Sequence, residues 1–385
     1  MTGEERRTRR WVLERLGVGS AAVGLASLSG CSSFREESRG SKRRDGYPGG
    51  ESATEGPDRD PDRAPTSEGG SQTPSAGPGV GVYLGDDTKL DQWEEWFRRP
   101  LDYYSIALFN ENWEDYVVDN WPVEVDLESI AKKYRVIVTF KMFPRGERLR
   151  SVAAGRFNTR YRALAADLVA NQLSDAYLRF GSEFNGRWAT ATAVGRPDLF
   201  VKAWKQVVTS MRSVDGAAFD FVWAPNVWRY HMNPVRAYPG DGWVDAVGLT
   251  VYDKGQYYPF PENCNRKCVQ ERRRRTWENI VNGRQAGFGL DFWANFARGH
   301  DKPLVFPEYG PVARNAPNPG GGDNPMFFDN FYRWMQSNRD VVDWHTPWAW
   351  TAGPHFVGPP ELKHESAYPA LPRASEAFRR LFGGE

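Results

Sequence analysis

Short apolar runs alternate with longer amphipathic segments from residue 79 to the end of the chain. Runs of this length, rich in β-branched and aromatic residues, predict β-strands. They occupy Gly79–Leu84, Tyr103–Phe109, Arg135–Phe140, Ala176–Glu183, Phe219–Asn226, Asp245–Tyr252, Pro303–Glu308 and Trp344–Trp350. The segments between them repeat their apolar positions at helical spacing. Predicted helices include Leu90–Arg98, Tyr161–Leu173, Pro197–Ser213 and Asn324–Ser337.

Strands alternating with helices over about 300 residues match a (β/α)₈ TIM barrel in number and length. An open, doubly wound sheet is the alternative architecture. A nucleotide-binding sheet of that kind carries a Gly-rich phosphate loop after its first strand, and no such loop follows Leu84. The pattern therefore favours the barrel.

The first residues have the pattern of an export signal. Arg9 and Arg10 precede an apolar run from Leu16 to Leu28, which ends in Leu-Ser-Gly before Cys31. Paired arginines before such a run resemble a twin-arginine signal, and the ending resembles a lipobox, which places a lipid on Cys31. An uncleaved membrane helix is the alternative, but the run is shorter than the ~20 residues that span a bilayer. We expect a signal peptide over 1–31 and a lipoprotein on the outer face of the cell membrane.

Residues 32–78 contain almost no apolar side chains and consist largely of Gly, Ser, Pro, Glu, Arg and Asp. Such a segment cannot bury enough surface to offset its conformational entropy. The composition predicts a disordered linker between the anchor and a catalytic barrel that spans 79–385.

The cysteine count fits an exported protein. The chain has three cysteines, Cys31, Cys264 and Cys268. If Cys31 carries the lipid, an even pair remains for a disulfide in an oxidising compartment. A zinc site is disfavoured, because no second Cys/His pair of suitable spacing lies nearby. We therefore expect a Cys264–Cys268 disulfide and no metal ion.

Charge and composition narrow the function. Lys and Arg number 50 against 49 Asp and Glu, which removes the electrostatic argument for a nucleic-acid partner. The tight basic run Arg272–Arg275 is typical of a solvated helix face. Sixteen tryptophans indicate either a bulky core or platforms on which sugar rings stack.

Two predicted strands end in a glutamate with glycine and aromatic neighbours. Glu183 follows the fourth strand and Glu308 ends the seventh. Active sites of these barrels lie at the carboxyl ends of the strands, where strands four and seven face each other. A carboxyl pair there has the geometry of glycoside hydrolysis, with one group protonated to assist the leaving oxygen and one ionised to attack. Arg179, on the same strand face as Glu183, would help keep Glu308 ionised.

Four segments resemble glycoside hydrolase family 26 of clan A. Phe180–Trp188 resembles its acid/base segment and Phe221–Asn226 its strand-five segment. Tyr238–Asp253 resembles its strand-six entry, and Phe306–Gly310 its nucleophile strand. These motifs are specific in combination and order, and the resemblance covers roughly 79–385.

The resemblance implies a retaining β-glycanase, with Glu183 as general acid/base and Glu308 as nucleophile. It also implies that Tyr252 hydrogen-bonds to the nucleophile. The family's acid/base is normally preceded by His, whereas this chain has Ser182, which affects substrate choice more than mechanism. A second tryptophan common after the acid/base motif is also missing.

Aromatic residues at or past the strand ends predict sugar-stacking platforms. The candidates are Trp188, Trp228, Tyr230, Trp348 and Trp350, with Trp350 as the floor of the site, and core packing is the alternative for each. The predicted substrate-binding residues are Arg179, Ser182, Trp188, Asn226, Trp228, Tyr252 and Trp350.

We therefore expect a monomeric, surface-anchored enzyme without a cofactor. Its first expected substrate is β-1,4-mannan, and β-1,3-xylan or mixed-linkage β-glucan is the alternative on the same two glutamates. A carbohydrate-binding lipoprotein without catalysis is the alternative of another class. Peptide or nucleotide chemistry is disfavoured, since no Ser/His/Asp set, metal spacing or phosphate loop is present.

Overall fold

The computed structural model describes residues 77–85, 87–108, 111–121, 127–283, 287–364 and 366–384. The predicted signal peptide, Cys31 and nearly all of the predicted linker lie outside these residues. No helix in the described part of the chain is both long and apolar enough to cross a bilayer.

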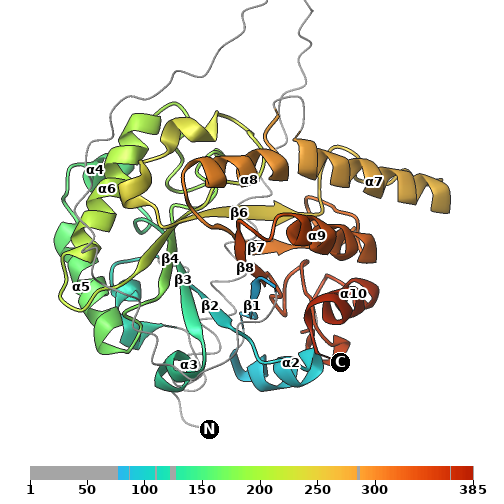
Figure 1. Cartoon of the computed structure of the whole chain (residues 1–385), viewed down its shortest axis with the longest axis horizontal. Coiled ribbons are helices and arrows are strands. Elements are labelled where there is room, and N and C mark those ends of the chain that lie inside the picture. The colour runs from blue at the N-terminus through green and yellow to red at the C-terminus, as the bar shows by residue number, and fades with distance from the viewer. Residues whose placement is uncertain are drawn as a thin grey trace, which may run out of the picture. The chain divides into compact units, whose positions relative to one another are not determined.

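Eight parallel strands close into a barrel in sequence order, which confirms the predicted (β/α)₈ fold (Figure 1). They are β1 (Gly79–Val82), β2 (Tyr103–Leu108), β3 (Arg135–Phe140), β4 (Tyr177–Phe180), β5 (Asp220–Trp223), β6 (Ala246–Tyr252), β7 (Leu304–Gly310) and β8 (Val342–Pro347). The α-helices surround them: α2 (Leu90–Phe97), α3 (Leu127–Lys133), α4 (Leu149–Ala153), α5 (Asn158–Ala170), α6 (Pro197–Arg212), α7 (Arg266–Asn282), α8 (Leu290–Gly299), α9 (Pro325–Ser337) and α10 (Pro372–Phe382).

Side-chain alternation along each strand separates two apolar layers. In β4, Phe180 points outward and its ring stacks on Trp204 of α6 at 4.2 Å. Tyr177 belongs instead to a second buried cluster, which also contains Trp344 of β8 and one side chain from most of the strands between them. Because side chains two apart share a face, Arg179 points into the barrel with Tyr177.

The register between β6 and β7 shifts beside Gly248. A Cβ atom there would lie 2.6 Å from Val222 Cγ1, so only glycine fits this approach. After the shift, Thr250 pairs with Glu308. The irregularity therefore brings a hydroxyl of β6 beside the predicted nucleophile.

Several strands end elsewhere than predicted, and the differences at β4, β5 and β8 move predicted site residues into loops. β4 ends at Phe180 and β5 at Trp223, so Glu183 and Asn226 lie in the loops that follow. The reason at β4 is Gly181, whose φ of 57° leaves the extended region. β8 ends at Pro347, and Trp350 therefore lies beyond the strand rather than at its end.

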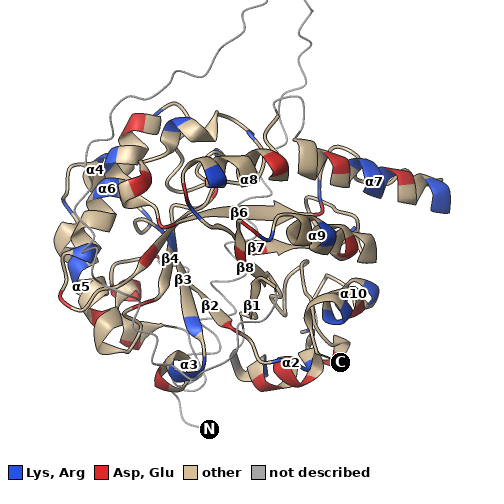
Figure 2. Ribbon diagram, viewed as in Figure 1, with Lys and Arg blue, Asp and Glu red and all other residues tan. Residues whose placement is uncertain are grey.

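The long segment after β6 contains α7, a helix with few buried residues that carries many charged side chains (Figure 2). The four arginines of the basic run 272–275 point in two directions and have different partners. Arg274 and Arg275 pair with Glu271 on the exposed face, as the pattern predicted. Arg272 and Arg273 donate instead to backbone carbonyls of neighbouring loops.

Candidate active site

Glu308 is held by one charged donor and one neutral donor. Arg179 Nη2 lies 2.8 Å from its Oε2, and the Tyr252 hydroxyl donates to Oε1 at 2.8 Å. The Arg179 side chain is fully buried, whereas that of Glu308 keeps 18% of its surface exposed. Charge-assisted hydrogen bonds of this kind are shorter and stronger than bonds between neutral groups. Glu308 is thus held at both carboxylate oxygens while part of its side chain stays exposed.

The position of Arg179 in β4 holds its guanidinium group beside Glu308. Its Nη2 also donates to Thr250 Oγ1 at 2.9 Å, the hydroxyl that the register shift in β6 brings alongside. Its Nε and Nη1 have no hydrogen-bond partner among the described residues. A buried cation with one anionic partner depends strongly on that partner. Arg179 and Glu308 are therefore an electrostatic pair at the barrel's core.

Glu183 receives only neutral donors. Asn226 Nδ2 donates to Oε1 at 2.6 Å, and Trp188 Nε1 donates to Oε2 at 2.8 Å. No Lys, Arg or His in the described part of the chain forms an ion pair with it. Glu183 therefore lacks the positively charged partner that Arg179 provides to Glu308. The two glutamates thus lie in electrostatically different surroundings.

The backbone at Glu183 is in the left-handed region, with φ of 54°. A non-glycine residue in this conformation carries strain and recurs at functional sites. Its amide donates to the Ala224 carbonyl at 2.8 Å, which ties the turn to the end of β5. The turn is held in place by its neighbour strand, so the side chain is aimed rather than free to swing.

Asn185 also joins the loops after β4 and β5, an arrangement that we call the Asn185 lock. It was not among the predicted substrate-binding residues. It is fully buried, accepts from the Asn226 amide at 2.9 Å, and donates to the carbonyls of Asn226 and Trp228. The loop after β4 therefore fixes the loop after β5. The signal in the sequence was the asparagine two residues after Glu183, whose role needs the partner loop to be seen.

The buried hydroxyl of Tyr252 is influenced by the charges of both glutamates. Burial raises the pKa of its hydroxyl well above the usual value, and the negative charges of Glu308 and Glu183 raise it further. The hydroxyl therefore stays protonated and donates to Glu308.

The aromatic residues predicted to stack on sugar differ in how much of their surface is exposed. Trp188 and Tyr230 are 42% and 37% exposed, and their rings meet edge to face at 4.8 Å. Trp228 is only 4% exposed and donates from Nε1 to the Asn279 carbonyl, so it is a core residue rather than a stacking surface. Trp188 thus combines an exposed ring with a hydrogen bond to Glu183.

The remaining predicted substrate-binding residues are Ser182 and Trp350, which lie in the loops after β4 and β8. Ser182 precedes Glu183 in the turn and is partly exposed. Trp350 is partly exposed in the loop after β8, and its ring packs on the backbone at Gly85, where a Cβ atom would lie 2.5 Å from Cδ1. The Trp348 ring stacks on Tyr83 at 3.8 Å.

His355 is a further neighbour of the site that the sequence did not single out. Its ring lies 4.3 Å from that of Tyr252, and its Nδ1 donates to the Pro311 carbonyl at 3.0 Å. Burial lowers the pKa of His355 to about 3, so the ring is neutral. It comes from the loop after β8, and no local sequence pattern marks it.

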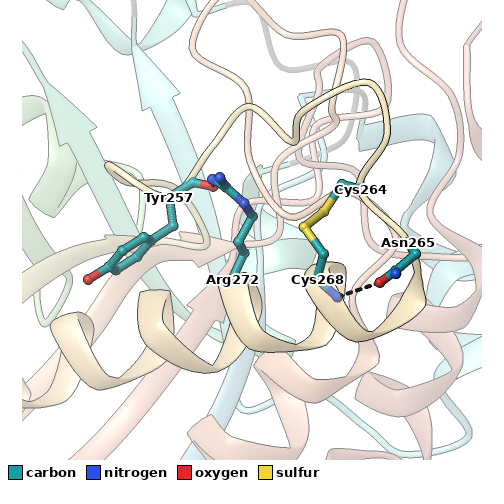
Figure 3. Close-up of a disulfide and its surroundings, with 5 residues drawn as sticks. All are labelled: Tyr257, Cys264, Asn265, Cys268 and Arg272. Atoms are coloured by element: carbon teal, nitrogen blue, oxygen red, sulfur yellow. Dashed lines mark hydrogen bonds between the residues drawn. A yellow bond between two sulfur atoms is a disulfide. The ribbon is translucent and has the colours of Figure 1, made fainter.

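Among the described residues, no group of His, Cys, Asp or Glu side chains could hold a metal ion. Cys264 and Cys268 form the predicted disulfide at the beginning of α7 (Figure 3).

Comparison with known proteins agrees with this geometry. The model of glycosyl hydrolase family 26 matches residues 153–267, which include Arg179, Glu183, Asn226 and Tyr252. The barrel carries the site of a glycoside hydrolase. No curated protein sequence matches the chain significantly.

Several solved structures share the fold at low sequence identity. An endo-β-1,4-mannanase from Cellulomonas fimi is 18% identical with a TM-score of 0.52, covering 79% of this chain and 70% of that chain. A family 26 β-mannanase from Bacteroides ovatus is 13% identical with a TM-score of 0.50, covering 79% and 88%. An endo-β-1,4-mannanase catalytic domain from Bacillus sp. JAMB-750 is 14% identical with a TM-score of 0.50, covering 78% and 84%.

Proposed function

We propose that this protein is a retaining glycoside hydrolase that cleaves β-linked polysaccharide, with β-1,4-mannan as the first substrate. The observation that carries the proposal is the difference between the two carboxylates. Glu308 is paired with a buried arginine, and Glu183 is bonded by an amide and an indole. Retaining hydrolysis needs this division between an ionised nucleophile and a protonated acid.

In the first step, Glu308 attacks the anomeric carbon and forms a glycosyl ester, while Glu183 donates its proton to the leaving oxygen. Glu183 then takes a proton from a water molecule, whose oxygen attacks the anomeric carbon and releases Glu308. Tyr252 and Arg179 hold Glu308 in one orientation throughout. Trp188 holds Glu183 through its indole N–H while offering its ring to a sugar.

The two roles are separable by experiment. Glu183→Ala should lose activity on polysaccharide but retain ester formation on a dinitrophenyl glycoside, whose leaving group needs no proton. Added azide should then rescue turnover, because it attacks the ester without base catalysis. Glu308→Ala should lose both activities. Equal behaviour of the two variants would contradict the assignment.

Retention of configuration is tested by proton NMR of the first product. A β-anomer formed first supports a double displacement, in which the carboxyl groups lie about 5–5.5 Å apart. An α-anomer formed first would overturn the retaining mechanism.

Mannan is supported by the similarity to the endo-β-1,4-mannanases from Cellulomonas fimi and Bacillus sp.. Ser182, which stands where the resembled family has His, leaves room beside Glu183 and is the reason to test other glycans. A reducing-sugar assay on mannan, glucomannan, β-1,3-xylan and barley β-glucan, with Glu308→Ala as control, decides the substrate. Binding without hydrolysis of any of them would favour the carbohydrate-binding lipoprotein.

We also propose that the enzyme is exported and anchored as a monomeric lipoprotein through Cys31. The support is the arginine pair and the Leu-Ser-Gly-Cys ending in the sequence. Cys31→Ala should release the protein from membranes, and light scattering of the released form should give the mass of one chain. Continued membrane association of the variant would favour an uncleaved helix.

A further inference from the structure

A second cavity, of about 800 Å³, lies outside the two-glutamate site. Residues of α7, the loop before α9 and the first turn of α10 form its walls, and these three helices succeed one another along one flank of the barrel (Figure 1). Four arginines line it, Arg266, Arg273, Arg314 and Arg373, and we call it the arginine cavity.

The positive charge of the arginine cavity is not neutralised within the described structure. Arg266, Arg314 and Arg373 form no ion pair with any described residue. Arg273 donates from Nη2 to the carbonyls of Gly321 and Asp323, at 2.7 and 3.0 Å, and not to a carboxylate. None of the four arginines thus forms an ion pair with a described carboxylate, and three of them are exposed to solvent.

Asp323 is the single carboxylate among the lining residues, and its Oδ1 already accepts from the Ala374 amide at 2.8 Å. Burial lowers the pKa of Arg273, Asp253 and Tyr258 oppose that effect, and the charges of Arg314 and Arg373 lower the pKa by smaller amounts. Arg273 is therefore repelled by Arg314 and Arg373, and an anion between them would relieve that repulsion.

The helix ends add to this field. Arg266 is the first residue of α7 and Arg373 the second of α10, and Pro325, which begins α9, also lines the cavity. The N-terminus of a helix is its positive end, where a cation is unfavourable and an anion is favoured. Three positive helix ends and four arginines thus act on the same space.

A disulfide lies at the beginning of α7, next to Arg266 of the arginine cavity in the sequence, and Figure 3 shows this bond. It joins Cys264 to Cys268 across Arg266, and Asn265 caps α7 by accepting from the Cys268 amide at 3.0 Å. Arg272 donates to the Tyr257 carbonyl one turn further on. The first turn of α7 is thus held rigid, which presents Arg266 at a defined position and lowers the entropic cost of binding.

The size and lining of the arginine cavity select the ligand. Its volume is that of a small-molecule site and exceeds what a bare inorganic anion fills. Val269, Met326 and Leu371 supply apolar wall between the charged groups. An apolar wall suits the C–H face of a sugar ring, and arginine forks match a planar carboxylate.

We propose that the arginine cavity is an auxiliary subsite for an acidic sugar, a uronate residue carried by the polysaccharide. The proposal rests on the proposed hydrolase function. A chain of contacts joins the two sites: Arg273 donates to the Gly321 carbonyl, the Gly321 amide donates to the Asp253 carbonyl at 3.1 Å, and Asp253 follows Tyr252. The two sites are thus linked through Asp253, the residue after β6, and in the proposal one substrate chain engages both.

Binding is tested on the intact enzyme by titration calorimetry with D-glucuronate, and with D-glucose and inorganic phosphate as comparisons. Glucuronate should bind, more weakly as salt rises, and glucose should not. Arg314→Gln with Arg373→Gln should weaken glucuronate binding by about tenfold or more. The charge-matched pair Arg160→Gln with Arg339→Gln, on exposed residues outside the cavity, should leave it unchanged.

Three results would overturn the subsite: no glucuronate binding, equal weakening in both double variants, or phosphate binding as tight as that of glucuronate. Kinetics on a glucuronate-branched substrate and its carboxyl-reduced form separate this proposal from the hydrolase. The arginine variants should raise KM on the acidic form alone. Hydrolysis of both forms without that selective effect overturns the subsite only. Glucuronate binding without hydrolysis of any glycan overturns the proposed function only.

Discussion

At the scale of single residues, the site depends on which donors each glutamate receives. Glu308 and Glu183 are the same residue type at the same end of the barrel, and each accepts two hydrogen bonds. One guanidinium makes the difference between them. Arg179 is placed by strand alternation and by the glycine-dependent register shift at Gly248. The geometry of the strands therefore determines which of the two glutamates is paired with a cation.

Tyr252→Phe should lower kcat by about tenfold or more while leaving the fold intact, because it removes only the hydroxyl that orients Glu308. Tyr309→Phe is the matched control, since Tyr309 is also a buried tyrosine and its hydroxyl contacts His345 instead. Steady-state kinetics on the preferred glycan measures both. A comparable loss of kcat in the control would argue against a specific role for Tyr252.

Glu308→Gln should lower the free energy of unfolding by about 3 kcal/mol, because it leaves the buried Arg179 without its anionic partner. Glu183→Gln should change stability much less, since its partners Asn226 and Trp188 are neutral. Urea denaturation followed by tryptophan fluorescence compares the variants. Equal losses would show that the ion pair does not bear on stability.

At the scale of elements, sequence patterns predicted the strands but not the conformations of the loops that follow them. Each of the eight predicted strands has a counterpart, because period-two apolar runs are a local property. Glu183 lies three residues past the end of β4, in a turn whose geometry depends on Gly181 and on a bond to Ala224. Trp228 was expected to stack on sugar but is buried, since apolar side chains alone do not tell which face meets solvent.

Reducing the Cys264–Cys268 disulfide, or replacing both residues by Ala, should lower the free energy of unfolding by at most about 2 kcal/mol. The bond closes a short loop, and the chain entropy that it removes grows with loop length. Urea unfolding with and without reductant measures this. Hydrogen exchange should quicken mainly in the first turn of α7, and a uniform loss of protection would contradict a local role.

At the scale of the whole molecule, two buried histidines link stability to pH. Burial lowers the pKa of His345 and of His355 from 6.5 to about 3. Between these values the unfolded chain binds protons that the folded chain does not. The free energy of unfolding should therefore fall as pH drops from about 6.5 to 3, by up to about 1.4 kcal/mol per pH unit for each histidine.

The slope of unfolding free energy against pH, from urea melts, measures this effect. His345→Gln should make the slope shallower, because glutamine does not titrate and can still accept from the Tyr309 hydroxyl. An unchanged slope in this variant would show that carboxylates alone govern the acid limit of stability.

The sequence by itself determined the barrel and the two glutamates, because strand periodicity and strand-end motifs are local and survive without knowledge of neighbours. Tertiary structure alone decided the ion pair of Arg179 with Glu308, the Asn185 lock and the nearness of His355. It also decided the arginine cavity, whose residues come from three helices and the loops between them. Contacts between segments far apart in the chain depend on how the closed barrel brings loop ends together, and no local pattern encodes that.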